Sequence, residues 1–112
     1  MAKTRAVLTQ LSVVAAVSLA HVSAVFADAP PLDPDALKRL VHQDCGSCHG
    51  LTLKGGLGPD IRPETLNHFD AETLELMILD GIPDTAMPPW RPLITQEEAR
   101  WIADYLLTGD AP

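Results

Sequence analysis

Apolar residues recur at helical spacing in three stretches of the chain. In the first, the apolar positions of residues 37–41 follow Asp33 and Pro34. This pair favours the start of a helix, because aspartate caps free amide groups and proline has no amide hydrogen that needs a partner. The pattern therefore predicts a helix from Pro34 to about Cys45.

The second and third stretches also carry end signals. Residues 74–78 place leucine, methionine and isoleucine on one face of a helix, with Asp70 as its N-cap and Gly81 at its end. Near the C-terminus, Thr95–Glu98 has the sequence of a capping box, and apolar spacing continues to about Leu107. These two helices and the first are expected to be the main elements of the fold.

Two long irregular segments connect the expected helices. Residues 50–62 contain four of the seven glycines, and residues 82–92 contain four of the ten prolines. Between them, Pro63–Leu66 is predicted to form a short helical turn, and no stretch alternates as a strand would. The sequence thus predicts an all-α fold of three main helices whose long loops wrap around something.

The N-terminal residues have the features of an export signal. Lys3 and Arg5 precede the apolar run Leu11–Ala20, and the small residues of Val25–Ala27 come directly before Asp28. Polar residues interrupt the apolar run, which is shorter than the ~20 residues that a membrane span requires. We therefore expect residues 1–27 to be a cleaved signal peptide and residues 28–112 to be one domain in the periplasm, with no membrane span after cleavage.

Charge and size limit what this domain can do. Residues 28–112 contain 15 acidic and six basic residues, a formal net charge of −9. Nucleic acids and anionic membranes attract the opposite sign, so neither is an expected partner. A domain of 85 residues buries only about 60–65% of its unfolded surface, which predicts that a disulfide, metal or cofactor completes the core.

The sequence Cys45-Gly-Ser-Cys48-His49 is a C-x-x-C-H motif, the attachment signature of c-type haem. Two thiols at this spacing can form thioethers with the two vinyl groups on one edge of the porphyrin. The histidine that follows then lies under the iron as an axial ligand. One covalent haem c would also supply the missing core.

Three other interpretations of the cysteines fit the sequence less well. A structural zinc site normally needs four ligands, and the chain has no second cysteine pair. A thioredoxin-like pair expects a βαβ setting, which the pattern does not provide. An ordinary disulfide is compatible with export, but it explains neither His49 nor the small core.

The second axial ligand is expected from a distant loop. Met87 is favoured, because the prolines that follow it stiffen the backbone and a thioether suits haem iron. Met77 is the alternative sulfur, although its helical spacing makes it a core residue first. His42 and His68 are further candidates. Trp90 is expected to pack against the porphyrin.

Other side chains have simpler interpretations. Trp101 and Tyr105 lie one helical turn apart and are expected to pack against the first helix. The acidic run on the predicted second helix is expected to be a solvated face, and it comprises Asp70, Glu72, Glu75 and Asp80.

The motifs together resemble the small class I cytochromes c. The similarity lies in C-G-S-C-H, in G-L-G-P at residues 56–59, in M-P-P-W, and in the C-terminal W-I-A-D-Y-L. The resemblance implies that the N- and C-terminal helices pack across each other beside the haem. It also implies that the carbonyl of Pro59 accepts a hydrogen bond from Nδ1 of the proximal histidine, which would set the orientation of the imidazole.

A closer resemblance covers nearly all of residues 28–112. DCGSCHG, LTLKGGLGP, MPPWRPLIT and EEARWIADYLL are similar to the NirC-type monohaem cytochrome c encoded with denitrification nitrite reductases. Electron transfer by haem needs no residue as acid, base or nucleophile, so we expect a single-electron carrier and not an enzyme, and we expect a monomer. The resemblance implies the carrier's place in denitrification. The carrier would receive electrons from an upstream donor and pass them to a cytochrome cd-type nitrite reductase. A role in maturing that reductase's haem d is the alternative, and a catalyst or gas sensor with an open iron site is a third.

Overall fold

The computed structural model describes residues 29–110, so the expected signal peptide at residues 1–27 lies outside the described residues. Within them the chain is helical and forms no strand. No helix among the described residues has the length and apolar character needed to cross a bilayer. The all-α prediction is confirmed, and the elements are α1 (Pro34–Leu40), η1 (Val41–Cys45), α2 (Gly46–His49), α3 (Pro63–Leu66), α4 (Ala71–Asp80) and α5 (Gln96–Thr108).

The first three elements follow one another without a break as one helical stretch. Asp33 begins it, since its Oδ1 accepts hydrogen bonds from the amides of Asp35 at 3.1 Å and Ala36 at 3.0 Å. The predicted end at Cys45 was wrong. A wide π turn over η1 is followed by one further α turn that ends at His49, so the whole C-x-x-C-H motif is helical.

The signals predicted for the later helices are confirmed. Oδ1 of Asp70 accepts the amide of Thr73 at 2.7 Å, at the start of α4. Thr95 and Glu98 form both hydrogen bonds of the capping box that begins α5. The short helical turn at Pro63–Leu66 is α3. These local signals fix the two helices that frame the core.

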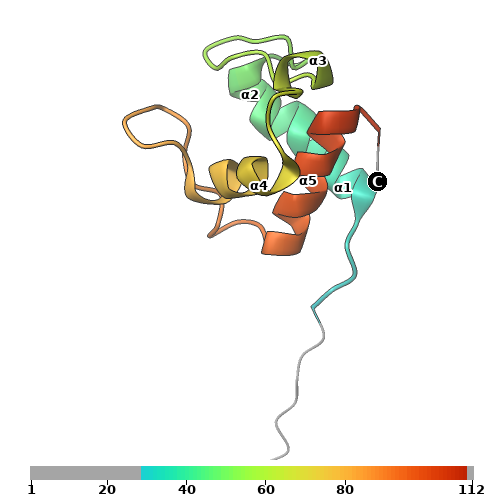
Figure 1. The fold of residues 1–112 in the computed structure, drawn as a ribbon. Coiled ribbons are helices and arrows are strands. Elements are labelled where there is room, and N and C mark those ends of the chain that lie inside the picture. Colours follow the sequence, from blue (N-terminus) through green and yellow to red (C-terminus); the bar gives the residue numbers. More distant parts are fainter. Residues whose placement is uncertain (1–28, 111–112) are drawn as a thin grey trace, which may run out of the picture.

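The core lies where α4 and α5 pack against each other, with the N-terminal helical stretch against the other side of α5 (Figure 1). Trp101 is buried in this core, as predicted, and its ring stacks on that of Tyr105 with centroids 5.3 Å apart. The fully buried side chains come from all three main helices, and the largest are Val41, Leu79 and Ile102.

One acidic residue does not fit the solvated face predicted for α4. Glu75 is only 5% exposed, and it accepts hydrogen bonds from Nε2 of Gln96 at 2.8 Å and from the Arg100 guanidinium at 3.3 Å. Both donors belong to α5. The buried carboxylate therefore joins α4 to α5, because a buried charge is tolerated only when it is paired and hydrogen-bonded.

Candidate functional site

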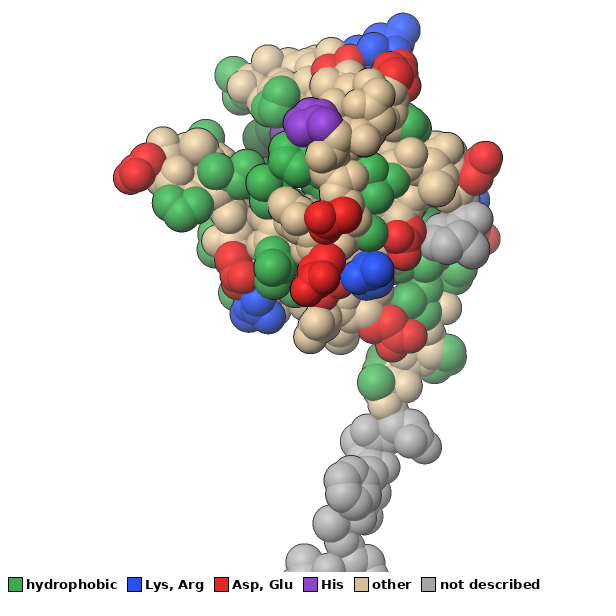
Figure 2. Space-filling view, in the orientation of Figure 1, with side chains coloured by type: hydrophobic (Ala, Val, Ile, Leu, Met, Phe, Trp, Pro, Cys, Tyr) green, Lys and Arg blue, Asp and Glu red, His purple; other side chains and the backbone are tan. Residues whose placement is uncertain are grey.

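A cavity of about 640 Å³ opens between the C-x-x-C-H motif, α4 and the loop that joins α4 to α5. In Figure 2, hydrophobic side chains gather in the hollow between this projecting loop and the body of the molecule. Most of the lining is apolar, which suits a large planar ligand. The apolar walls include Leu57, Ile61, Leu66, Phe69, Leu74, Ile78, Ile82, Ile102 and Leu106.

Cys45 and Cys48 lie on the wall of this cavity and are not joined to each other. Cys45 is half-buried, whereas Cys48 is exposed. Burial, with a smaller contribution from the carboxylate of Asp44, raises the pKa of the Cys45 thiol to about 11. Among the described residues, no group of three or more histidine, cysteine, aspartate or glutamate side chains is placed to hold a metal ion, so the geometry does not support a zinc site at these cysteines.

His49 is held from two sides by the glycine-rich loop. Its Nδ1 donates a hydrogen bond to the carbonyl oxygen of Pro59, 2.7 Å away, which is the contact that the cytochrome c resemblance implies. The backbone of Gly58 lies against the ring, and a Cβ at that position would be 2.7 Å from Cε1 of His49. The amides of Gly58 and Gly55 also bond the carbonyls of Cys48 and His49. These contacts together fix the orientation of the imidazole ring.

Both candidate sulfurs lie on the cavity wall. Met87 belongs to the loop after α4, and Met77 comes from α4 itself. The interpretation of Met77 as a core residue was incomplete, because its half-buried side chain packs on the core and also faces the cavity. Trp90 is half-buried and lines the same cavity, where the sequence placed it against a porphyrin.

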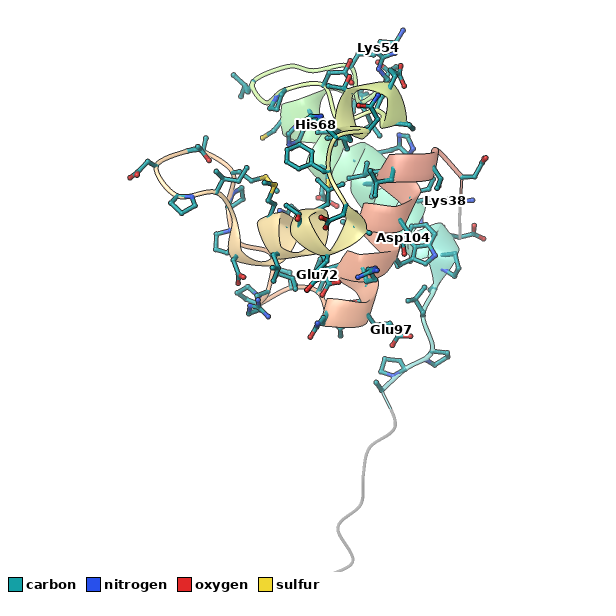
Figure 3. All side chains as sticks on the ribbon, in the orientation of Figure 1. Lys38, Lys54, His68, Glu72, Glu97 and Asp104 are labelled. Carbon is teal, nitrogen blue, oxygen red and sulfur yellow. The ribbon has the colours of Figure 1, made fainter. Side chains whose placement is uncertain are left out.

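The two other histidine candidates do not line this cavity. Nε2 of His42 lies 2.9 Å from the hydroxyl of Tyr105, and both residues border a separate cavity of about 170 Å³. His68 is exposed on the connection between α3 and α4, with its ring against that of Phe69 (Figure 3). Among the described residues, His49 is thus the histidine that reaches the large cavity.

The sequence interpretation missed part of the cavity wall. Leu57 is 95% exposed at the mouth although it also lines the cavity, and Phe69 closes part of the inner wall. A leucine between two glycines is the signal that could have drawn attention to Leu57. Phe69 follows α3 and carries no comparable local signal.

The contact between Gly58 and His49 gives a first prediction. Gly58→Ala would place a methyl group against the imidazole, and overpacking of this kind costs about 1–3 kcal/mol. A displaced ring would lose its hydrogen bond to Pro59. If His49 is the iron ligand that the sequence predicts, it would then be a poorer donor to iron, which favours ferrous haem. We expect a lower melting temperature and a higher reduction potential, measured by thermal unfolding and redox titration.

Gly46→Ala is the matched control for this prediction. Gly46 is helical, and the nearest atom to an added Cβ would be 3.4 Å away, an acceptable contact for a small shift. Alanine also favours a helix by up to ~1 kcal/mol relative to glycine. If Gly58→Ala kept the potential and melting temperature of the Gly46→Ala variant, the packing of Gly58 on His49 would have no effect on the site.

Comparisons with known proteins agree with this geometry. Residues 32–106 match the family model of cytochrome c oxidase, cbb3-type, subunit III. Cytochrome c55X of Paracoccus denitrificans is 62% identical over 73 residues, which are 65% of this chain and 71% of the relative. Cytochrome c55X of Pseudomonas aeruginosa is 48% identical over 69% of each chain. A solved c-type cytochrome NirC is 48% identical, with a TM-score of 0.66 over 70% of this chain and 93% of that one.

This chain belongs to the NirC-type cytochromes c. As a member of that family it is an electron-transfer protein and not an enzyme, and it carries one covalent haem c at Cys45 and Cys48. The residues of the site fit that group, since two sulfurs and an oriented imidazole lie on the wall of a largely apolar cavity. A second solved structure that is similar to this chain is the dihydro-heme d1 dehydrogenase NirN in complex with DHE. It is 32% identical with a TM-score of 0.60, over 67% of this chain and 16% of NirN.

Proposed function

We propose that this cytochrome carries single electrons in the periplasm from an upstream donor to a cytochrome cd-type nitrite reductase during denitrification. The observation that carries the proposal is the match to NirC and to cytochrome c55X along nearly the whole domain. The formal charge of −9 on residues 28–112 complements a partner with a basic docking face. Reduction of the purified reductase by the reduced cytochrome, followed in stopped flow, tests it directly.

His49 and Met87 are proposed as the axial ligands of the haem iron. The support for His49 is its place directly after the cysteines and its fixed Nδ1, which leaves Nε2 as the free nitrogen. Met87 is supported by its place on the cavity wall in a loop stiffened by prolines. Pro59 then tunes the electron donation of His49 through its carbonyl, and Trp90 packs on the ring.

The bound haem supplies one-electron oxidation and reduction at iron, and the polypeptide supplies its environment. The apolar walls exclude water from the cavity, and this limits the solvent reorganisation that accompanies a change of charge. The hydrogen bond from His49 to Pro59 holds one ligand in a constant orientation in both oxidation states. With both axial positions filled, the iron would have no position for a substrate.

Export is the setting that this function requires. We propose that residues 1–27 direct the chain to the periplasm and are removed before Asp28. The support is the basic start, the short apolar run and the small residues before the proposed cleavage point. N-terminal sequencing of protein purified from the periplasm should begin at Asp28, and a retained N-terminus would contradict the cleavage.

Leu57 offers a test of where the partner docks. Its exposed side chain borders the mouth of the haem cavity, so a docked partner would cover it. Loss of an apolar contact of this kind costs about 1 kcal/mol, or roughly a fivefold loss of affinity. We expect Leu57→Gln to raise the KM for the reductase about fivefold.

Leu93→Gln is the control for the docking test. Leu93 is 74% exposed, comparable to Leu57, but it does not line the cavity. We expect wild-type kinetics for this variant. Equal effects of both substitutions would show that docking does not centre on the cavity mouth. Added salt should raise the KM of both variants, because an acidic protein is attracted to a basic face.

Maturation of haem d is a second candidate function, and one observation favours it. The chain is similar to part of NirN, which is named as a dihydro-heme d1 dehydrogenase. Deletion of the gene separates the two functions. A reductase that lacks haem d would support maturation, whereas an intact reductase that receives too few electrons supports the carrier role.

A further inference from the structure

The loop that carries Met87 is closed on itself at its base. This loop, residues 81–91, projects from the end of α4 and returns to it before α5 (Figure 1). The amides of Trp90 and Arg91 donate to the carbonyls of Ile78 and Leu79, at 3.1 and 3.0 Å. These carbonyls belong to the last turn of α4, where helix carbonyls lack partners of their own. The loop thus begins and ends at the same helix turn.

Gly81 is a second point at which the two sides of the loop approach closely. Its φ is +70°, a backbone region that favours glycine, and a Cβ there would be 2.7 Å from the carbonyl oxygen of Met87. The amide of Ile82 also points at that oxygen, at 3.4 Å. One peptide group of Met87 is therefore held against the end of α4.

The other peptide group of Met87 is held by a single hydroxyl. Oγ1 of Thr85 donates to the carbonyl of Ile82 at 2.7 Å and accepts the amide of Met87 at 3.3 Å. The hydroxyl thus links the outgoing and returning sides of the loop. The turn that it spans includes Asp84 at φ +61°, a region that costs energy for residues other than glycine. Such a turn persists only where neighbouring contacts hold it.

We propose that Thr85 is a positioning residue that holds Met87 on the haem iron. The proposal rests on Met87 being the axial ligand, as proposed above. Thr85 does not bind iron. Its hydroxyl fixes the amide of Met87 while Gly81 and Ile82 hold the carbonyl, so the direction of the methionine side chain is set by the loop. Without the hydroxyl, Met87 should leave the iron more readily.

The test uses the haem-loaded protein with Thr85→Val, which keeps the shape of the side chain and removes the hydroxyl, and Thr85→Ser, which keeps the hydroxyl. One net hydrogen bond corresponds to about a five- to tenfold change in an equilibrium constant. We expect carbon monoxide to bind the ferrous Thr85→Val protein about five- to tenfold more readily than wild type. The near-infrared band of thioether-bound ferric haem should also disappear at a lower pH. Thr85→Ser should behave as wild type.

Thr108→Val controls for a loss of stability. Thr108 is also exposed and outside the cavity lining, and its Oγ1 lies within 3 Å of two carbonyl oxygens at the end of α5, to either of which it can donate. This variant should lower the melting temperature without any spectral change. The proposal would be overturned if Thr85→Val kept the wild-type band and carbon monoxide binding. It would also be overturned if Thr85→Ser changed both properties as much as Thr85→Val does. Met87→Ala, measured in parallel, separates a failure of this proposal from a wrong ligand assignment. If Met87 is the ligand, Met87→Ala loses the near-infrared band; if the band remains in Met87→Ala, Met87 is not the ligand.

Discussion

Replacement of both Cys45 and Cys48 by alanine is expected to give a polypeptide that keeps no haem through denaturing electrophoresis and shows no cooperative thermal transition. Without the thioethers, the ring would be held by its axial ligands and by packing in a cavity that opens to solvent. When the ring leaves, the apolar walls of a cavity of about 640 Å³ face water. A domain of 85 residues has little other core with which to offset that exposure.

The two single cysteine variants test whether one thioether is enough to retain the haem. Cys45→Ala and Cys48→Ala each leave one thioether, and each should retain haem on the gel with a reduced melting temperature. Haem staining and thermal unfolding by circular dichroism are the two measurements. A sharp transition in the haem-free double variant would mean that the helices alone form a sufficient core. Covalent haem in that variant would refute attachment through these cysteines.

The helices were predictable because their signals are local. Asp33, Asp70 and the Thr95–Glu98 box each act on amide groups within three residues, so a cap needs no knowledge of the rest of the fold. The continuation of the first helix to His49 had no such signal. Gly46 and Ser47 extend no apolar stripe, and the turn there is held by the loop that packs on it and bonds its carbonyls.

Met77 shows where periodicity reaches its limit. Apolar spacing identifies the face of α4 that avoids water, but it does not distinguish a protein core from the wall of a cofactor cavity. In this fold the two are continuous, because Leu74 and Ile78 belong to the core and also line the cavity. Glu75 illustrates the converse, since only its partners on α5 explain why a carboxylate can be buried on that helix.

The contacts around His49 and Met87 were the least predictable. Two such contacts depend on the conformations of irregular loops. They are the packing of Gly58 on His49 and the hydrogen bond from the amide of Met87 to Thr85. The composition of those loops predicted that they wrap around something, which the cavity supports. The composition did not predict which glycine contacts His49 or which hydroxyl contacts Met87, because such contacts depend on the final conformation of the loops.

Met87→Ala is expected to open the iron of the haem-loaded protein. The wild-type ferric protein should show the weak near-infrared band of thioether-bound haem, and the ferrous form should resist carbon monoxide at neutral pH. The variant should lose the band, bind carbon monoxide readily, and have a lower reduction potential, since a thioether stabilises ferrous iron. The loop should stay closed on α4, because the amides of Trp90 and Arg91 still donate to carbonyls of its last turn, so the helices should stay folded.

Met77→Leu tests whether Met87 alone is responsible for the band and the resistance to carbon monoxide, because both methionine sulfurs line the cavity. It is nearly volume-conserving, so we expect less than about 1.5 kcal/mol of destabilisation, with the band and the resistance to carbon monoxide unchanged. The double variant should match Met87→Ala. If the double variant binds carbon monoxide more readily than Met87→Ala, Met77 replaces the lost ligand from α4. If Met77→Leu is the single variant that loses the band, then Met77 is the ligand, and the carrier function stands. Ready carbon monoxide binding by the wild-type protein would instead favour a sensor or catalyst with an open iron site.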